Sequence, residues 1–308
     1  MKSNNIETYN ELVYEWIFYH KQFIKESTYS NYINIIDNHL NKDLGLFLIE
    51  DITNNTLQEY VLSKHNQKLS IKSIKDIMVV FKLSLRYGFK RDYIVSFDLS
   101  IKYPKVTSKN LIEILSSNEI NKIVSFVMNS DDTRDLGILI ALLTGMRIGE
   151  ISALRYSDIC FKSNTIYISR TLQRIYTKQE KTKVIETTPK TNSSIRAIPL
   201  SRELKEILKD QKYDSTDYVL SLSSTAVEPR LLRKRFDSLL SKTKIKHHKF
   251  HSLRHTFATK CIEAKIDYKT LSVLLGHSNI DTTLNLYVHP NISQKKKAIN
   301  KLTASILR

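Results

Sequence analysis

The sequence predicts a mostly α-helical protein with two domains: a small all-helical domain, then a larger α+β domain that carries a small antiparallel sheet. Apolar residues recur at helical spacing over 7–98 and again after residue 116, whereas segments within 158–200 are typical of strands. A polar, basic and proline-broken segment, 102–109, separates the two helical regions. The length of 308 residues and a hydrophobic content of 41% suit two domains with cores of their own.

Four helices are expected in the first domain. One lies near the N-terminus, a second begins at Thr28 and ends near Gly45, a third follows Thr53, and a fourth runs from Ser70 to Gly88. The apolar stripes predicted to face the core are Leu12, Val13, Trp16 and Ile17 in the first helix, Ile33, Ile36 and Leu40 in the second, and Ile74, Ile77, Met78, Phe81 and Leu85 in the fourth.

The second domain is expected to open with a capping box. Ser116 and Glu119 have the spacing at which each side chain bonds to the backbone amide of the other. Helices should continue to about Arg155, give way to strands, and resume from Ser201 to the end. The predicted strands are Ile159–Phe161, Thr165–Thr171, Val184–Thr187 and Ile195–Leu200.

The charge of the chain favours a polyanionic partner. The formal net charge is +17 and the pI is about 9.6. Part of this charge is solvated lysine in a chain rich in Lys, Asn and Ile, and charge alone does not separate DNA from RNA or an anionic membrane. The longest apolar run, Leu136–Met146, is too short to span a bilayer, and the N-terminus lacks the apolar core of a signal peptide. Because Cys160 and Cys261 also need no disulfide, a cytoplasmic protein is expected.

Four short segments carry side chains suited to holding a phosphodiester and attacking it with a phenol. These side chains are Arg147, Lys190, His251, Arg254, His277 and Tyr287. Guanidinium groups are planar, always charged and bidentate, so the two arginines can clamp the two non-bridging oxygens. A phenol has a pKa of about 10 and needs help to lose its proton. His251 lies three residues before Arg254, on the same helical face, and can act there as general acid or base.

The other three candidates complete the chemistry. Lys190 lies in a predicted strand turn, where a mobile ammonium could protonate the departing sugar oxygen. His277 follows a glycine that suits a helix end, and its ring could donate a second hydrogen bond to the phosphate. Tyr287 is the only tyrosine after His277, so this segment offers one nucleophile.

Ordinary structural interpretations compete with these assignments. Arg147 and Glu150 could form a surface ion pair, and we interpret Glu150 as the partner that holds Arg147. His255 is expected to be a buried packing residue. His247, His251 and His255 recur at helical spacing, but no zinc motif or nearby carboxylate completes a site. No metal or other cofactor is therefore expected.

These motifs resemble the tyrosine recombinases, or phage-type integrases, and most strongly the integrases of conjugative transposons and phages. The matching segments, in the family's order, are TGMRIGEISALR (144–155), TPKTNSSIRAIPL (188–200), HSLRHTFAT (251–259) and LGHSNIDTTLNLYVH (275–289). The resemblance implies a SAM-like core-binding domain at 5–101, a linker at 102–115 and a tyrosine-recombinase catalytic domain at 116–308.

The resemblance also implies a function. A site-specific recombinase of this kind integrates or excises a mobile element through a 3′-phosphotyrosyl intermediate and a free 5′-hydroxyl, without metal or nucleotide. Its partner would be double-stranded DNA, gripped between the two domains and bound by a homotetramer on paired sites. An excision factor or a host DNA-bending protein could join it. Larger integrases of this group carry an extra N-terminal arm-binding domain, for which we expect no room in this chain.

Alternatives within and beyond this class stay open. A Xer-like resolvase of chromosome or plasmid dimers would use the same residues. A catalytically silent DNA-binding accessory protein would be expected to lack the tyrosine or an arginine, and none is missing here. A type IB topoisomerase would use similar chemistry, but the small helical domain and the segment from His277 to Tyr287 favour a recombinase.

Overall fold

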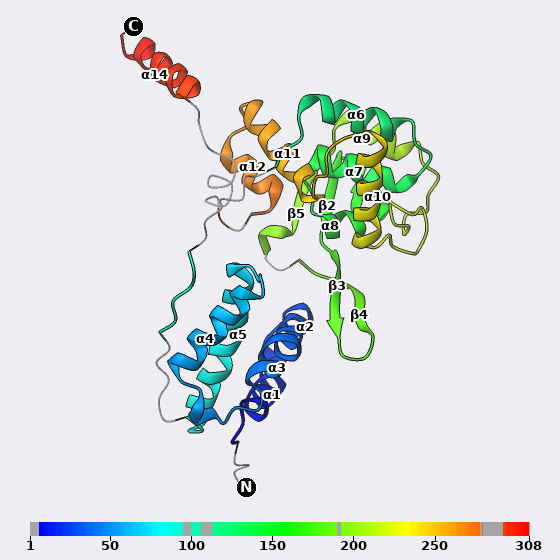
Figure 1. The fold of residues 1–308 in the computed structure, drawn as a ribbon. Coiled ribbons are helices and arrows are strands. Elements are labelled where there is room, and N and C mark those ends of the chain that lie inside the picture. Colours follow the sequence, from blue (N-terminus) through cyan, green and yellow to red (C-terminus); the bar gives the residue numbers. More distant parts are fainter. Residues whose placement is uncertain are drawn as a thin grey trace. The chain divides into compact units, whose positions relative to one another are not determined.

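The computed structural model describes residues 6–94, 100–105, 113–189, 192–277, 279 and 292–307. Its elements form two compact units (Figure 1). The first unit comprises Met1–Asn110 together with Arg174–Lys183, and the second comprises Leu111–Gln173 and Val184–Arg308. The predicted linker at 102–115 lies partly outside the described residues, so its boundaries stay a prediction.

The N-terminal part of the first unit is helical, as predicted. Thr8, Thr53 and Ser70 cap their helices with a side-chain oxygen that accepts a hydrogen bond from a backbone amide. Its helices are α1 (Tyr9–His20), α2 (Glu26–Ile35), α3 (Asn41–Leu44), α4 (Asn54–Asn66) and α5 (Ile71–Lys90), with a π-helical segment, Ile36–Leu40, between α2 and α3. The second predicted helix therefore begins two residues earlier than Thr28, and it is interrupted by the π-helical segment rather than continuous.

Apolar side chains from α1 and α5 dominate the core of the first unit. Every residue of the predicted stripes is buried there, including Trp16 on α1 and Phe81 on α5. The phenol of Tyr9 is fully buried and lies 3.1 Å from the hydroxyl of Ser84 across the helix pair. This hydrogen bond satisfies a polar group that burial would otherwise leave without a partner.

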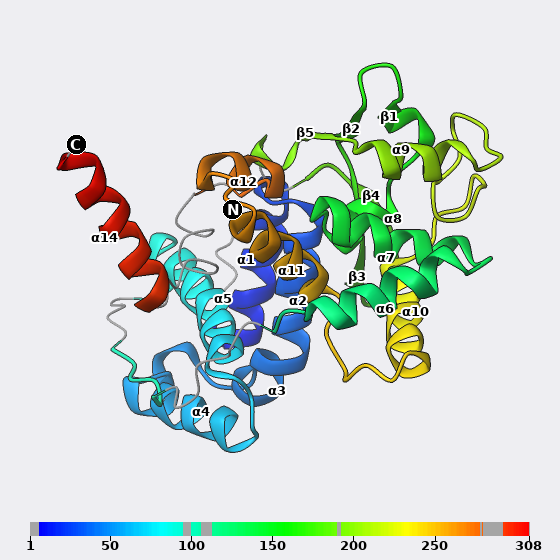
Figure 2. The same ribbon diagram turned by 90° about the horizontal axis from the view of Figure 1, so that it is seen from above.

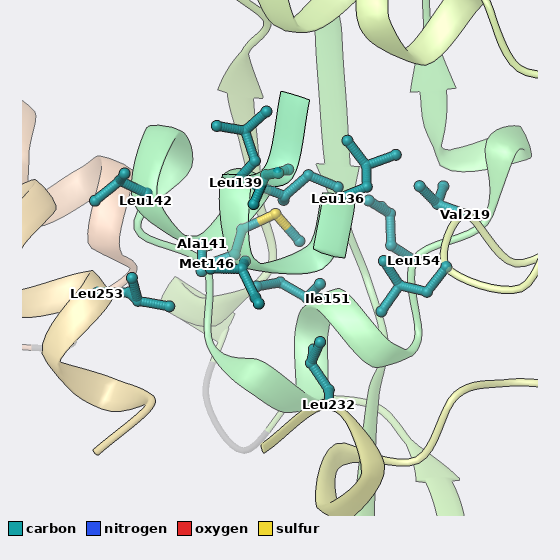
Figure 3. Packing of buried hydrophobic residues seen from close by; sticks show 14 of the residues in the cluster. Leu136, Leu139, Ala141, Leu142, Met146, Ile151, Leu154, Val219, Leu232 and Leu253 are labelled. Carbon is teal, nitrogen blue, oxygen red and sulfur yellow. The ribbon is translucent and has the colours of Figure 1, made fainter. Parts of the chain in front are cut away.

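The second unit is built around one largely buried helix. The capping box predicted at Ser116 and Glu119 is present and opens α6. Helix α7 is mostly apolar and most of its residues are buried, because α6, α10 and α11 pack against it (Figure 2). Figure 3 shows its side chains, among them Leu136 and Leu139, meeting those of neighbouring elements. The helices of this unit are α6 (Ser117–Met128), α7 (Thr133–Thr144), α8 (Ile148–Ser152), α9 (Arg202–Lys209), α10 (Pro229–Lys242), α11 (His251–Glu263), α12 (Tyr268–Leu275) and α14 (Ile292–Ile306).

A three-stranded antiparallel sheet lies beside these helices in the second unit. Its order is β1 (Ile159–Cys160), β2 (Thr165–Ile168), β5 (Arg196–Pro199). In its register Ile166 is paired with Ile159 on one side and with Ile198 on the other, so three buried isoleucines face the core together. The small antiparallel sheet of the predicted fold class is confirmed.

The prediction found only part of a second pair of strands: the strand expected over Val184–Thr187 is confirmed as the second half of β4. The strand expected over Thr165–Thr171 ends at Ile168, and a separate pair follows, β3 (Thr171–Thr177) and β4 (Lys181–Thr187). The first half of β4 was missed because it consists of three exposed residues, Lys-Thr-Lys, and has no apolar alternation. Pairing with β3, rather than burial, makes this segment a strand.

The expectation of helices from Ser201 onward needs one correction. Ser201 does cap α9, yet residues 210–228 form turns and isolated bridges before α10 begins. Within the described ranges no helix is long and apolar enough to cross a membrane.

Candidate active site

Arg147 lies in the tight turn between two helices of the second unit. Helix α7 ends at Thr144 because Gly145 adopts a left-handed conformation with φ of 65°, and α8 begins one residue after Arg147. The backbone N–H of Arg147 donates to Glu150 at 2.9 Å, and its Nη1 donates to the same carboxylate at 2.9 Å. Its Nη2 donates to the carbonyl oxygen of Gly276 at 3.1 Å. The side chain stays 37% exposed, so it is held in place and remains accessible.

Glu150 is the buried anion that organises this turn. Besides the two hydrogen bonds from Arg147, its carboxylate accepts bonds from Nη1 and Nη2 of Arg196, at 3.0 and 2.9 Å. Burial raises the pKa of Glu150, but the hydrogen bonds and charge of Arg196, together with those of Arg147, outweigh burial and lower the pKa below its usual range. The interpretation of Glu150 as the partner of Arg147 is confirmed.

Arg254 bonds to the ends of two helices at once. Arg254 lies on α11 and is only 2% exposed. Nη1 donates to the carbonyl oxygen of Gly145 at the end of α7, and Nη2 donates to that of Leu275 at the end of α12, both at 2.8 Å. Carbonyls at helix C-termini have no partner within the helix and carry partial negative charge, so a guanidinium stabilises both ends.

His251 and His277 stand near these arginines. His251 is the first residue of α11. Its ring and that of His255 form a T-shaped contact, with centroids 4.6 Å apart. Burial, and after it the charges of His255, Arg254 and Arg147, together lower the pKa of His251 to about 4. Burial likewise lowers the pKa of His277 to about 4, aided by the same two arginines. Both imidazoles are therefore neutral at pH 7.

A second left-handed glycine, Gly276, turns the chain from α12 into His277. Its φ is 64°, and a Cβ at this position would lie 3.0 Å from the carbonyl oxygen of Ser193 and 3.0 Å from Nη1 of Arg196. The prediction that a glycine ends the helix before His277 is confirmed. Only a glycine lets the backbone approach Arg196 this closely.

The structure thus brings together four of the six predicted site residues. Arg147, His251, Arg254 and His277 interact with one another or with the same helix ends. The predicted acid Lys190 and the predicted nucleophile Tyr287 lie outside the described residues, so their placement is untested.

A cavity of about 530 Å³ opens beside His251 and Arg254. Its volume is in the range that holds a nucleotide-sized group. The further lining residues are Met146, Ile148, Arg233, Asp237, His247, Lys249 and Phe250. His247 belongs to the loop before α11 and pairs with Asp237 at 3.6 Å, so it does not share a helical face with His251. In the part of the chain that the structure describes, no group of three or more His, Cys, Asp or Glu residues could hold a metal ion.

Sequence reasoning missed Arg196. It was placed in a strand, as the structure confirms, but with no role assigned to it. Its side chain is 3% exposed and is bonded to Glu150, to the carbonyl of Ser194 and to the carbonyl of Leu274. The available signal was a charged residue at an inward position of the Ile195–Leu200 strand, where an apolar side chain is normal.

Comparison with known proteins agrees with this geometry. The sequence profile described as the phage integrase family matches residues 113–294, more than half of the chain. This chain belongs to the phage integrase family. The profile described as the N-terminal SAM-like domain of phage integrases matches residues 8–65. The resemblance stated from the four motifs is confirmed, as is the SAM-like domain of the predicted fold class.

Relatives of this phage integrase family member come from mobile elements and from the Xer group. A tyrosine recombinase XerC-like protein of Caldanaerobacter subterraneus is 29% identical, covering 96% of this chain and 82% of the relative. The transposase from transposon Tn916 of Enterococcus faecalis is 26% identical over 85% of this chain and 70% of its own length. The structure of the Tn1549 transposon integrase in complex with a circular intermediate DNA has a TM-score of 0.77 at 23% identity, covering 96% of this chain and all of that one. This last likeness shows the shared fold.

Proposed function

We propose that this phage integrase family member is a site-specific DNA recombinase that cuts and rejoins DNA through a covalent bond between Tyr287 and a 3′-phosphate. The observation that carries the proposal is the convergence of two arginines and two neutral histidines on one set of helix ends. The family match spans Lys190 and Tyr287 as well.

The proposed step conserves atoms and charge. The phenolic oxygen of Tyr287 attacks the phosphorus, a tyrosyl O–P bond forms, and the bond from phosphorus to the 5′-oxygen breaks. The phenol proton passes to His251, and Lys190 donates a proton to the departing 5′-oxygen. The same step run backwards, with a 5′-hydroxyl from another strand as nucleophile, joins the exchanged ends and releases Tyr287.

The described residues supply the electrostatics of this step. Arg147 and Arg254 are fixed by Glu150 and by helix carbonyls before any substrate arrives. Donors that are already oriented stabilise charge on the non-bridging oxygens without a reorganisation cost during reaction. The neutral ring of His251 can accept a proton at pH 7, and that of His277 can donate a hydrogen bond.

Double-stranded DNA is the proposed partner. The Tn1549 integrase, which shares the fold, was solved with DNA, and the net charge of +17 suits phosphate contacts along a duplex. A core-binding domain at 5–101 and a catalytic domain at 116–308 would contact the duplex together, and four protomers would assemble on paired sites. An excision factor or a host DNA-bending protein could join this assembly.

Two biological roles remain for such an enzyme. The Tn916 relative favours integration and excision of a mobile element, which is our main proposal. The XerC-like relative favours resolution of chromosome or plasmid dimers. Direct repeats that flank the gene, together with a neighbouring excision factor, would support the first role and exclude the second.

The direct test is covalent trapping. A DNA substrate nicked near the cleavage point should leave the wild-type protein attached, because the released fragment diffuses away before religation. Tyr287→Phe should bind the same DNA with unchanged affinity and form no adduct, since only the attacking oxygen is lost. An adduct formed by the phenylalanine variant would disprove the assignment of Tyr287.

A further inference from the structure

Arg196 links three parts of the site that are far apart in the sequence. From β5 it reaches Glu150 on α8 through Nη1 and Nη2, and its Nε donates to the carbonyl oxygen of Leu274 in α12 at 2.7 Å. Nη1 also donates to the carbonyl oxygen of Ser194, just before β5, at 3.1 Å. These bonds use most of the donors of a guanidinium group, and the side chain is 3% exposed. Most of the hydrogen-bonding capacity of Arg196 therefore serves groups of the protein itself.

We propose that Arg196 is a positioning residue that fixes Arg147 and the α12 end, so that the phosphate clamp is assembled before DNA binds. It acts on Arg147 through the shared carboxylate of Glu150. It acts on the α12 end, which leads to His277, through the carbonyl of Leu274. This inference rests on the proposed function, because the step that it supports is cleavage of a phosphodiester.

The consequence of losing Arg196 follows from the charge balance around Glu150. The carboxylate is 3% exposed and accepts four hydrogen bonds, two from Arg147 and two from Arg196. Without Arg196, a buried carboxylate would keep Arg147 as its only counter-ion and draw that guanidinium toward itself. The donors of Arg147 would then point to Glu150 rather than to a phosphate. The carbonyl of Leu274 would also lose its partner, which loosens the turn at Gly276.

The first test compares Arg196→Met with a matched control elsewhere in the same unit. Arg235 and Asp135 form another buried ion pair, at the opposite end of α7, with side chains 14% and 1% exposed. Arg235→Met also leaves a buried carboxylate without that partner, so a comparable loss of stability is expected. We expect Arg196→Met to attach to a nicked substrate at least about 100-fold more slowly than the wild type. Arg235→Met should attach at near the wild-type rate, and both should keep DNA affinity.

A double variant separates positioning from folding. Glu150→Met combined with Arg196→Met removes both buried charges, and such replacements by apolar residues are often neutral for stability. We expect this variant to unfold at a urea concentration near that of the wild type and still to attach slowly. Wild-type attachment by the double variant would show that the pair serves only to fold the chain, and the inference would be wrong.

A neutral substrate gives a second criterion that folding does not affect. A methylphosphonate at the cleavage point has no charge on its phosphoryl group, so it depends less on a correctly placed Arg147. The deficit of Arg196→Met should shrink by about tenfold or more on this substrate, as should that of Arg147→Ala. An equal deficit on both substrates would overturn the inference.

Outcomes for this inference and for the proposed function are distinct. If the wild-type protein forms no adduct, the recombinase proposal itself fails. If the wild type forms an adduct through Tyr287 and Arg196→Met does so equally fast, only the role of Arg196 is refuted. Arg196→Lys is a variant that keeps the buried positive charge. However, a single ammonium cannot bond to both Glu150 and the carbonyl of Leu274 as the guanidinium does. It should therefore also attach slowly.

Discussion

Replacement of Arg254 by lysine keeps the charge and removes the fork, which isolates the contribution of geometry. The guanidinium bonds at 2.8 Å to the carbonyls of Gly145 and Leu275, which end different helices. A single ammonium on a flexible stem can retain one of these contacts at most. Hydrogen bonds to charged groups contribute about 1.5–3 kcal/mol each, so the free energy of unfolding should fall by roughly that amount.

The effect on cleavage should exceed the effect on stability. An oriented donor aimed at developing charge is worth about 10²–10³ in rate, and Arg254→Lys misplaces that donor as well as the helix ends it holds. Single-turnover attachment to a nicked substrate measures the rate, urea denaturation measures stability, and a binding isotherm confirms that DNA is still bound. Arg134→Lys is the matched control, because Arg134 forms a half-exposed pair with Asp132 at the start of α7. If Arg254→Lys cleaved within about tenfold of the wild type, the preorganised clamp would be the wrong explanation.

Four other predictions follow from the same chemistry. Lys190→Ala should slow cleavage of a substrate with a normal 5′-oxygen leaving group far more than cleavage of a 5′-phosphorothiolate, whose leaving group needs no proton. Equal losses of rate on both substrates would show that Lys190 is not the general acid. The pKa of His251 and that of His277 are about 4 in the folded chain and about 6.5 in the unfolded chain. Between these pH values the unfolded chain binds more protons, so the urea midpoint of unfolding should fall as the pH drops from 6.5 to 4. His277→Asn should flatten that dependence. Cleavage should survive EDTA and need no ATP, whereas binding should weaken steeply with salt; restoration of activity by magnesium after EDTA would point to another mechanism. Deletion of the residues after Pro290 should spare binding to a single DNA site and impair pairing of two sites. The reason is that Ile299, Leu302 and Ile306 of α14 are exposed and suit docking on a neighbouring protomer. A truncated protein that recombines normally would show that the tail has no such role.

Helix positions were predictable because their signals are local. Helix caps accept a hydrogen bond from the backbone amide three residues later, as at Thr53, Ser70 and Ser116. An apolar stripe, such as that of α5, shows directly which face of its helix is buried. The outer part of the β3–β4 pair was not predictable from pattern, because its residues are held by contacts with distant parts of the chain. The hydroxyl of Ser30 donates to the carbonyl of Tyr176, and Lys183 pairs with Glu26. Those partners lie more than a hundred residues away in the sequence.

The site shows the same division between local and distant information. Its residue types were identified from four motifs, and the glycine before His277 was expected to end a helix, but the motifs alone do not say which side chains bond to that helix end. In the structure, Gly145 and Gly276 each end a helix with positive φ and leave its last carbonyls open to an arginine from elsewhere. Arg254 of the third motif donates to the carbonyls of Gly145 in the first and Leu275 in the fourth. Arg147 of the first motif donates to that of Gly276 in the fourth.

This reciprocity explains how the two clamp arginines are held in place. Each arginine that would contact the phosphate also satisfies a helix end, so the donors are oriented by groups that need a partner in any case. The inward position of Arg196 in its strand marks it as unusual, but its role depends on Glu150, a carboxylate 46 residues earlier in the chain. A change at any one of these helix ends should therefore affect catalysis through an arginine that belongs to a different motif.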